Sequence, residues 1–92
     1  MLLYLVAYDI SCNKRRKKVS DLLEGYGRRV QYSVFECVLP TDKFDELRQR
    51  LKPHVDQTED SIRFYPLSRH TRNQVEIWGE LPVTQAPKSV VV

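Results

Sequence analysis

Residues 29–39 read Arg-Val-Gln-Tyr-Ser-Val-Phe-Glu-Cys-Val-Leu, an extended stretch whose division into strands decides the fold. Eleven residues is long for one strand, since strands in globular proteins usually span about five or six residues. We expect a tight turn or a bulge near Tyr32 and Ser33 that breaks the stretch into a hairpin, although no Gly or Pro marks the place.

The segments before this hairpin predict a strand and a helix. Residues 2–8 are an unbroken apolar run, typical of a central strand that is buried on both faces. Ser11 or Asn13 can cap the helix that follows, and Gly25 and Gly27 supply its stop signal. Its apolar stripe, at helical spacing, consists of Val19, Leu22, Leu23 and Tyr26.

The segments after the hairpin repeat the pattern. We expect a second helix from Thr41 to Pro53, a strand over 61–67, a polar loop over 68–74 and a short strand over 75–78. The order is β-α-β-β-α-β plus one extra C-terminal strand. Right-handed crossovers turn this order into an α+β, ferredoxin-like fold, with a four-stranded antiparallel sheet and two helices on one face.

The open face of such a sheet needs a cover. Residues 29–38 and 61–67 carry apolar side chains on both faces. We therefore expect a homodimer whose sheets pack face to face, with the 75–78 strand added to the partner's edge. We assign residues 1–81 to the folded domain and residues 82–92 to a flexible tail.

Composition and length restrict the class of protein. A chain of 92 residues makes one domain. No apolar stretch approaches the roughly 20 residues of a membrane span, and the N-terminal run lacks the features of a signal peptide. We expect a cytoplasmic protein in which Cys12 and Cys37 are reduced thiols. His54 and His70 stand alone, so we expect no zinc site.

The basic residues are concentrated near the first helix, where residues 1–29 carry seven Lys or Arg against three carboxylates. A block of cations there is either a solvated helix face or a polyanion-binding surface. Cations in the first turns oppose the helix dipole, and a helix N-terminus already binds phosphate, so we favour the second interpretation. Arg28 and Arg29 extend the same patch, or Arg29 pairs with a carboxylate of the dimer. The block is Lys14, Arg15, Arg16, Lys17 and Lys18.

Asp9 ends the first apolar run and has two interpretations. It is either a strand-end residue that turns the chain or a ligand of Mg²⁺ or Mn²⁺. One carboxylate is a poor site for such an ion, but a two-fold dimer brings two Asp9 side chains together. Tyr8 either lines this acidic site or packs, whereas Tyr32 and Phe35 are more typical of a core.

With these residues laid out, the chain resembles the small CRISPR-associated Cas-two family over residues 1–81. The string over 29–37 is its most specific part. The resemblance implies a ferredoxin-like homodimer with a swapped C-terminal strand and a metal in the dimer cleft, ligated by Asp9 of each subunit. The other matching segments are Tyr8-Asp9-Ile10-Ser11, Lys14–Val19, Leu22–Gly27, Ile62–Leu67 and Val75–Gly79.

The resemblance also implies a function. Members of the family are assigned metal-dependent cleavage of single-stranded RNA or double-stranded DNA, and they bridge two dimers of the CRISPR integrase in spacer adaptation. Lys18 stands where some relatives have Arg, which loses a planar fork. The alternatives are a non-catalytic DNA-binding scaffold and a VapD-like ribonuclease toxin. The polar positions around the family's cleft correspond here to Tyr8, Arg16, Lys18, Arg29, Ser33 and Phe35.

Overall fold

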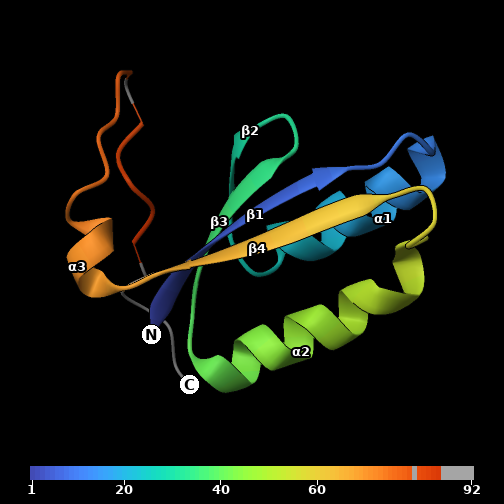
Figure 1. Ribbon diagram of the computed structural model, residues 1–92, viewed down its shortest axis with the longest axis horizontal. Helices are drawn as coiled ribbons and strands as arrows, with labels where there is room; N and C mark the ends of the chain where they lie inside the picture. Colours follow the sequence, from blue (N-terminus) through green and yellow to red (C-terminus); the bar gives the residue numbers. More distant parts are fainter. Residues whose placement is uncertain (80, 86–92) are drawn as a thin grey trace.

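The structure is a computed structural model that describes residues 1–79 and 81–85 (Figure 1). Four strands form one antiparallel sheet in the order β2-β3-β1-β4, and α1 and α2 lie together on one of its faces. This is the predicted ferredoxin-like α+β fold. The strands are β1 (Leu2–Asp9), β2 (Arg28–Gln31), β3 (Val34–Leu39) and β4 (Ser61–Leu67). The helices are α1 (Asn13–Glu24), α2 (Thr41–Leu51), a 3-10 turn (Lys52–His54) and α3 (Arg69–Arg72).

The hairpin predicted within residues 29–39 is confirmed. Strand β2 ends at Gln31 and β3 begins at Val34, so Tyr32 and Ser33 form the turn. The register shifts between Arg29 and Gln31, which is a bulge in β2. Gly27 precedes β2 and lies so close to β3 that a methyl group at this position would overlap the backbone of Cys37.

Strand β1 is central in the sheet, as predicted, since it pairs with β3 on one side and with β4 on the other. Tyr4, Val6 and Tyr8 are buried beneath the helices. The ring of Tyr4 stacks on Phe44 of α2 with centroids 3.7 Å apart, and Phe44 meets Phe64 of β4 edge-on at 5.6 Å. Three rings therefore join β1, α2 and β4 in the core.

The helix boundaries differ from the prediction at their first residues. The residue that caps α1 is Cys12, in an extended conformation and without a side-chain hydrogen bond, rather than Ser11 or Asn13. The amide oxygen of Asn13 instead accepts a hydrogen bond from Arg16. Pro40, rather than Thr41, precedes α2 in the cap position. The stop at Gly25 is confirmed, since α1 ends at Glu24.

The region after β4 also departs from the prediction. The expected polar loop over 68–74 contains the short helix α3, which Ser68 caps by accepting a hydrogen bond from the backbone N–H of Thr71 at 3.2 Å. Residues 75–78 are irregular in the single chain instead of a strand. Their pairing with a second copy stays a prediction, because it requires that copy.

The beginning of the C-terminal segment contacts the sheet. The backbone N–H and hydroxyl of Thr84 donate to the carboxylate of Glu36 at 3.1 and 2.7 Å, and Arg28 donates to the carbonyl of Pro82. Residues 86–92 of the predicted tail lie outside the described residues. None of the helices within residues 1–79 and 81–85 is long and apolar enough to cross a membrane.

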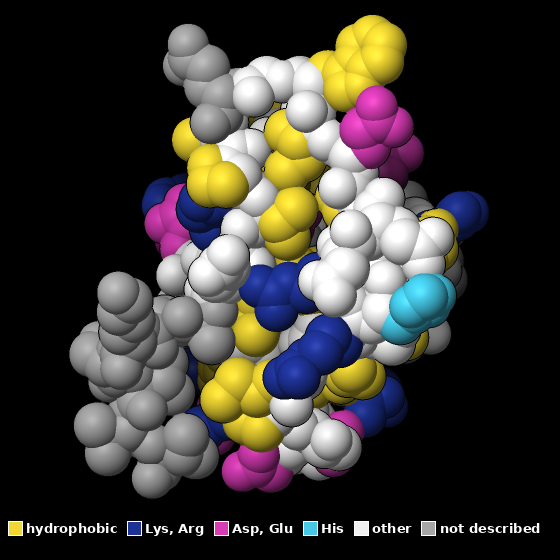
Figure 2. Space-filling model, turned by 90° about the vertical axis from the view of Figure 1, so that its left-hand side faces the viewer, with side chains coloured by type: hydrophobic (Ala, Val, Ile, Leu, Met, Phe, Trp, Pro, Cys, Tyr) yellow, Lys and Arg dark blue, Asp and Glu magenta, His cyan; other side chains and the backbone are white. Residues whose placement is uncertain are grey.

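The side of the molecule that carries α3 exposes hydrophobic side chains beside Lys and Arg side chains (Figure 2). Trp78 is 91% exposed and therefore almost without cover in the single chain. Such a concentration of apolar surface is typical of an interface. The exposed apolar residues of this region are Tyr65, Val75, Ile77, Trp78 and Leu81.

Candidate functional site

Asp9 is the last residue of β1 and lies opposite Ser61, the first residue of β4. Its side chain is exposed, although Tyr8 before it and Ile10 after it are buried. Within residues 1–79 and 81–85, no hydrogen bond or ion pair engages its carboxylate. A rigid strand therefore presents an available carboxylate to solvent.

The loop that follows Asp9 is held by Arg16. The guanidinium donates to the carbonyl of Ile10 at 2.8 Å, more weakly to that of Ser11 at 3.4 Å, and also to the amide oxygen of Asn13. Arg16 was predicted to bind nucleic acid. Its hydrogen bonds fix the path of the chain from β1 into α1, directly after Asp9; its contact with nucleic acid stays a prediction.

An aromatic pair lies under the end of β1. The rings of Tyr8 and Phe35 are stacked with centroids 6.4 Å apart, and the guanidinium of Arg29 lies 5.3 Å from the centroid of Phe35. Burial raises the pKa of the Tyr8 phenol, and the nearby charge of Arg29 opposes that shift. Phe35 is fully buried, so it belongs to the core as predicted, and Tyr8 packs there too. The same prediction is wrong for Tyr32, which is 69% exposed because it lies in the turn between β2 and β3.

The turn of the hairpin reaches the same place, because the backbone N–H of Tyr8 donates to the carbonyl of Ser33 at 3.1 Å. Arg29 also forms an ion pair with Glu24 of its own chain at 3.8 Å; a contact of Arg29 with a carboxylate of a second copy stays a prediction. The structure therefore brings six of the predicted residues together at one end of the sheet. They are Tyr8, Asp9, Arg16, Arg29, Ser33 and Phe35.

The predicted basic block does not act as one unit. Arg15 pairs with Asp60 and Glu59, and Lys17 pairs with Asp21 at 3.0 Å. Lys14 and Lys18 are exposed and form no ion pair within the part of the chain that the structure describes. These two lie at i and i+4, so they share one face of α1.

Arg28 is separate from this cluster. It donates to the carbonyl of Pro82, and its Nε atom is buried with no hydrogen-bond partner among the described residues. It faces Glu36 in the register of β2 and β3. Of the predicted nucleic-acid contacts, Arg28 therefore interacts with the C-terminal segment rather than with the end of β1.

The oxygen donors at this end of the sheet decide whether a divalent metal fits there. Mg²⁺ prefers near-octahedral oxygen ligands, and Asp9 provides a hard oxygen with no competing partner. The described residues contain no cluster of three or more His, Cys, Asp or Glu that could hold a metal. Asp9 therefore fits a site that is completed from outside the single chain, by a second copy or by phosphate oxygens.

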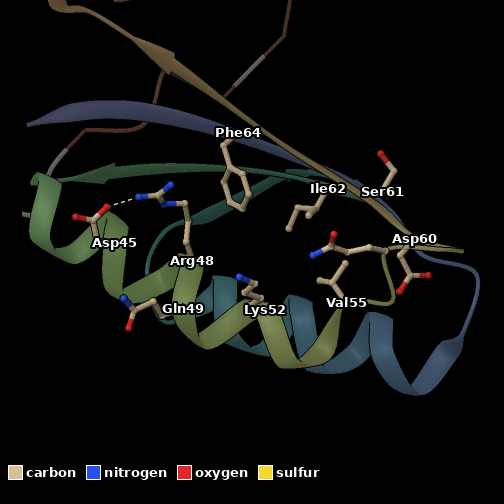
Figure 3. Close-up of a pocket in the computed structure, with 10 residues that line it drawn as sticks. Asp45, Arg48, Gln49, Lys52, Val55, Asp60, Ser61, Ile62 and Phe64 are labelled. Carbon is tan, nitrogen blue, oxygen red and sulfur yellow. Dashed lines mark hydrogen bonds and ion pairs between the residues drawn. The ribbon is translucent and has the colours of Figure 1, made fainter.

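Sequence reasoning missed two features near this end of the sheet. One is a groove of about 770 Å³ between α2 and β4, whose walls combine Phe64 and Ile62 with the cations Arg48 and Lys52 (Figure 3). The other is the buried carboxylate of Asp60, whose partner lies 45 residues away in sequence. No local pattern distinguishes this aspartate from its acidic neighbours.

Comparison with known proteins gives a family-model match. The family model described as CRISPR associated protein Cas2 matches residues 1–75. A CRISPR-associated endoribonuclease Cas2 from Synechocystis sp. is 62% identical over 92 residues and is covered fully, as is this chain. A CRISPR-associated endonuclease Cas2 from Thermus thermophilus is 43% identical over 83 residues, which covers 90% of this chain and 88% of the relative.

A solved structure agrees with the sequence matches. A chain in a partial Cas6-RT-Cas1–Cas2 complex superposes with a TM-score of 0.76 and 37% identity, covering 94% of this chain and 100% of that one. The likeness therefore extends over nearly the whole length of the fold.

Proposed function

This chain belongs to the CRISPR-associated protein Cas2 family, and we propose that it is a metal-dependent endonuclease that also bridges the integrase in spacer adaptation. The observation that carries the proposal is the exposed, unengaged carboxylate of Asp9 at the end of a buried strand. The names of the relatives support nuclease activity, since one is called an endoribonuclease and another an endonuclease. The similar chain in a Cas1–Cas2 complex supports the role in adaptation.

The proposed chemistry is hydrolysis of phosphodiester bonds in single-stranded RNA or double-stranded DNA. Asp9 from each of two copies would hold the divalent cation, Mg²⁺ or Mn²⁺. Such a cation polarises a phosphoryl oxygen and lowers the pKa of a bound water. Arg29, held over the ring of Phe35, places a positive charge near this end of the sheet, where it offsets charge that develops on phosphate.

The proposed homodimer explains two further features of the single chain. Among the described residues, α1 and α2 leave one face of the sheet without a helix, and apolar residues beyond β4 are exposed. Packing two open faces together buries these surfaces and supplies the second carboxylate that one chain lacks. Like charges at close range disfavour the ionised pair, so metal binding depends on the dimer and on pH.

Nucleic-acid binding would use the exposed cations. Lys14 and Lys18 present two positive charges on one face of α1, and backbone contacts of this kind carry little sequence information. We expect weak sequence preference and a strong dependence of affinity on salt. A binding curve that stays flat between low and moderate salt contradicts this part of the proposal.

The test is a cleavage assay on labelled single-stranded RNA and double-stranded DNA, with Mg²⁺, with Mn²⁺ and with a chelator. It compares wild type, Asp9→Asn and Asp42→Asn, where Asp42 is an exposed carboxylate in the first turn of α2. We expect cleavage that requires metal and is lost in Asp9→Asn but retained in Asp42→Asn, with nucleic-acid binding intact in all three. Equal cleavage by wild type and Asp9→Asn refutes the catalytic role.

A non-catalytic DNA-binding scaffold is the second candidate. The observation that favours it is that the end of β1 offers one carboxylate, whereas a hydrolytic metal site needs several oxygen ligands. The described residues contain no group of three or more potential metal ligands. In that case neither wild type nor Asp9→Asn cleaves, both bind duplex DNA, and Asp9→Asn supports spacer acquisition in cells. Loss of acquisition in Asp9→Asn with normal DNA binding excludes the scaffold as the whole function.

A further inference from the structure

Arg15 and Asp60 form a two-pronged ion pair between α1 and the start of β4. Nε of Arg15 donates to Oδ2 of Asp60 at 2.8 Å, and Nη2 donates to Oδ1 at 3.0 Å. A third bond runs from Nη2 to the carboxylate of Glu59 at 3.0 Å. The Asp60 side chain is fully buried, while that of Arg15 is 28% exposed. Bidentate pairs of this kind are among the strongest hydrogen-bonded contacts in proteins.

The buried carboxylate is also tied into its own loop. The backbone N–H of Asp56 donates to Oδ2 of Asp60 at 2.9 Å, and the N–H of Asp60 donates to the carbonyl of Asp56 at 2.7 Å. Asp56 in turn accepts from the backbone N–H and hydroxyl of Thr58 at 3.0 and 2.7 Å. The loop over 56–60 is therefore a closed turn, and removal of Arg15 would leave a buried charge without its partner.

The position of this pair connects it to Asp9. Asp60 directly precedes Ser61, and Ser61 is the residue opposite Asp9 in the register of β1 and β4. Figure 3 shows Asp60 and Ser61 side by side at the start of β4. Arg15 lies in the first turn of α1, just beyond the loop that leaves Asp9. The ion pair thus closes a ring that runs from β1 through the loop and α1 to β4, and back to β1.

We infer that Arg15 and Asp60 are positioning residues that hold the end of β1 and the start of β4 together and so fix the place of Asp9. Arg15 is then not a phosphate contact, although it belongs to the basic block. Arg16 also holds this loop, through a hydrogen bond to the carbonyl of Ile10. The inference deepens the proposed function and rests on it, since accurate placement of a metal ligand requires a fixed strand end.

Four variants separate this role from phosphate binding. Arg15→Lys keeps the charge but loses the planar fork, Arg15→Gln removes the charge, and Asp60→Asn removes the buried charge. Asp21→Asn is the matched control, because Asp21 is the carboxylate partner of Lys17 on the same helix but has no link to β4. All measurements are made on the full chain, well below the midpoint of thermal unfolding of each variant.

Three quantities are measured. Amide hydrogen exchange in the metal-free protein reports on the ends of β1 and β4, with the centre of β1 as an internal reference. We expect Arg15→Lys and Asp60→Asn to accelerate exchange about tenfold at the strand ends only. Mn²⁺ affinity, measured by electron paramagnetic resonance, should fall about tenfold or more in both variants. Asp21→Asn should change neither quantity.

The third quantity is the dependence of duplex DNA affinity on salt. Loss of one phosphate contact lowers the slope of log affinity against log salt by about 0.9, so Arg15→Gln should leave this slope unchanged. If Arg15→Gln lowers the slope while strand-end exchange and Mn²⁺ affinity stay at wild-type values, the inference is overturned. Uniformly faster exchange along all of β1 also overturns it, since that outcome indicates a general loss of stability.

The failure of the proposed function gives a different result. If Asp9→Asn binds Mn²⁺ as tightly as wild type, Asp9 is not a metal ligand and the proposed chemistry fails. Exchange in the metal-free protein still decides whether the pair holds the strand ends, because that readout requires no metal. Local acceleration in Arg15→Lys then supports the structural part of the inference.

Discussion

Replacing Gly27 with alanine tests how closely β2 enters the sheet. A methyl group built at Gly27 lies 2.9 Å from Cα of Cys37 and closer still to Sγ of Cys37 and to the carbonyl oxygen of Glu36. Two of these three atoms belong to the backbone of β3, and backbone atoms cannot avoid the methyl group by a change of side-chain rotamer. Gly27→Ala therefore requires the hairpin to move relative to its neighbour.

The expected cost follows from two opposing terms. Overpacking of a tight site costs about 1 to 3 kcal/mol, and backbone overlap places this site at the upper end. The lower conformational entropy of the unfolded chain returns about 0.4 to 1 kcal/mol when alanine replaces glycine. We expect a net loss of about 2 to 2.6 kcal/mol. In a chain of this size the thermal midpoint should then fall by roughly 8 to 21 °C.

Gly25 supplies the matched control for this experiment. It is two residues away, adopts φ −76° and ψ −10°, and a methyl group there meets only the carbonyl oxygen of Leu22 at 3.4 Å. That conformation is available to alanine, so Gly25→Ala should be neutral or stabilising by up to about 1 kcal/mol. Both variants are unfolded by heat, with circular dichroism as the readout, at one protein concentration because association shifts the midpoint.

The reasoning fails if the free energy of unfolding of Gly27→Ala is within about 0.5 kcal/mol of wild type, the range of ordinary surface substitutions. It also fails if the two alanine variants have equal midpoints, since the structure distinguishes them by a backbone overlap at one site only. A large loss in Gly27→Ala with no loss in Gly25→Ala establishes the close approach of β2 to β3.

Three other results are expected. The Arg15 guanidinium holds the pKa of the Asp60 carboxyl below its usual range. The stability that the ionised carboxylate contributes is therefore complete above pH about 3.9 and is lost as pH falls through the lower pKa of the folded state. Urea midpoints measured between pH 6 and pH 2 should fall less steeply with decreasing pH in Asp60→Asn than in wild type. Burial raises the pKa of the Cys37 thiol to about 12, whereas the backbone N–H of the first turn of α1 lowers the pKa of Cys12. A thiol reagent at neutral pH should therefore modify Cys12 in a fast phase that is absent from Cys12→Ser, and a fast phase that persists in that variant would contradict the assignment. Lys14 and Lys18 should each supply one phosphate contact. Replacing both with Gln should therefore lower the slope of log affinity against log salt for duplex DNA by about 1.8. An unchanged slope would show that this face of α1 does not contact the nucleic acid.

The alternation and spacing of apolar residues were sufficient to predict the strands and the two long helices. Strand β4 has the predicted bounds, Ser61–Leu67, because polar segments flank it on both sides. The break at Tyr32 and Ser33 was inferred from length alone and is confirmed. In these cases the sequence pattern is local, because the spacing of apolar residues within one strand or helix depends on which of its faces is buried.

The helix caps and α3 show where local signals stop. Asn13 is a good capping residue, yet its side chain accepts from Arg16, and Cys12 takes the cap position. The four residues of α3 are too few for a hydrophobic period, and a single cap at Ser68 defines where the helix begins. Which residue takes the cap position depends on competition between possible hydrogen-bond partners, and the sequence alone does not show which partner is favoured.

The sequence singles out Asp9 as a candidate ligand, but it does not give the roles of the cations that surround it. Asp9 was identified because it ends an apolar run, and the position of Phe35 followed from its hydrophobic surroundings. The partner of Arg15, in contrast, is 45 residues away and belongs to a loop with several acidic residues. Only the fold brings the two together, so a cation that pairs inside the protein cannot be distinguished in sequence from one that faces solvent.

The arginines and the lysines of the basic block have different surroundings, which bears on the proposed binding of a polyanion. Arg15 and Arg16 are occupied by contacts that hold the chain around Asp9, whereas Lys14 and Lys18 have no ion pair within residues 1–79 and 81–85. Like charges at i and i+4 destabilise a helix by about 0.2 to 0.5 kcal/mol, so folding alone gives no reason to place both lysines there. The arginines with planar forks shape the strand end. The lysines are compact point charges on flexible stems, and we propose them as the contacts for a nucleic-acid backbone. A nucleic-acid backbone bound along this face of α1 would then contact the helix that follows Asp9 in the chain.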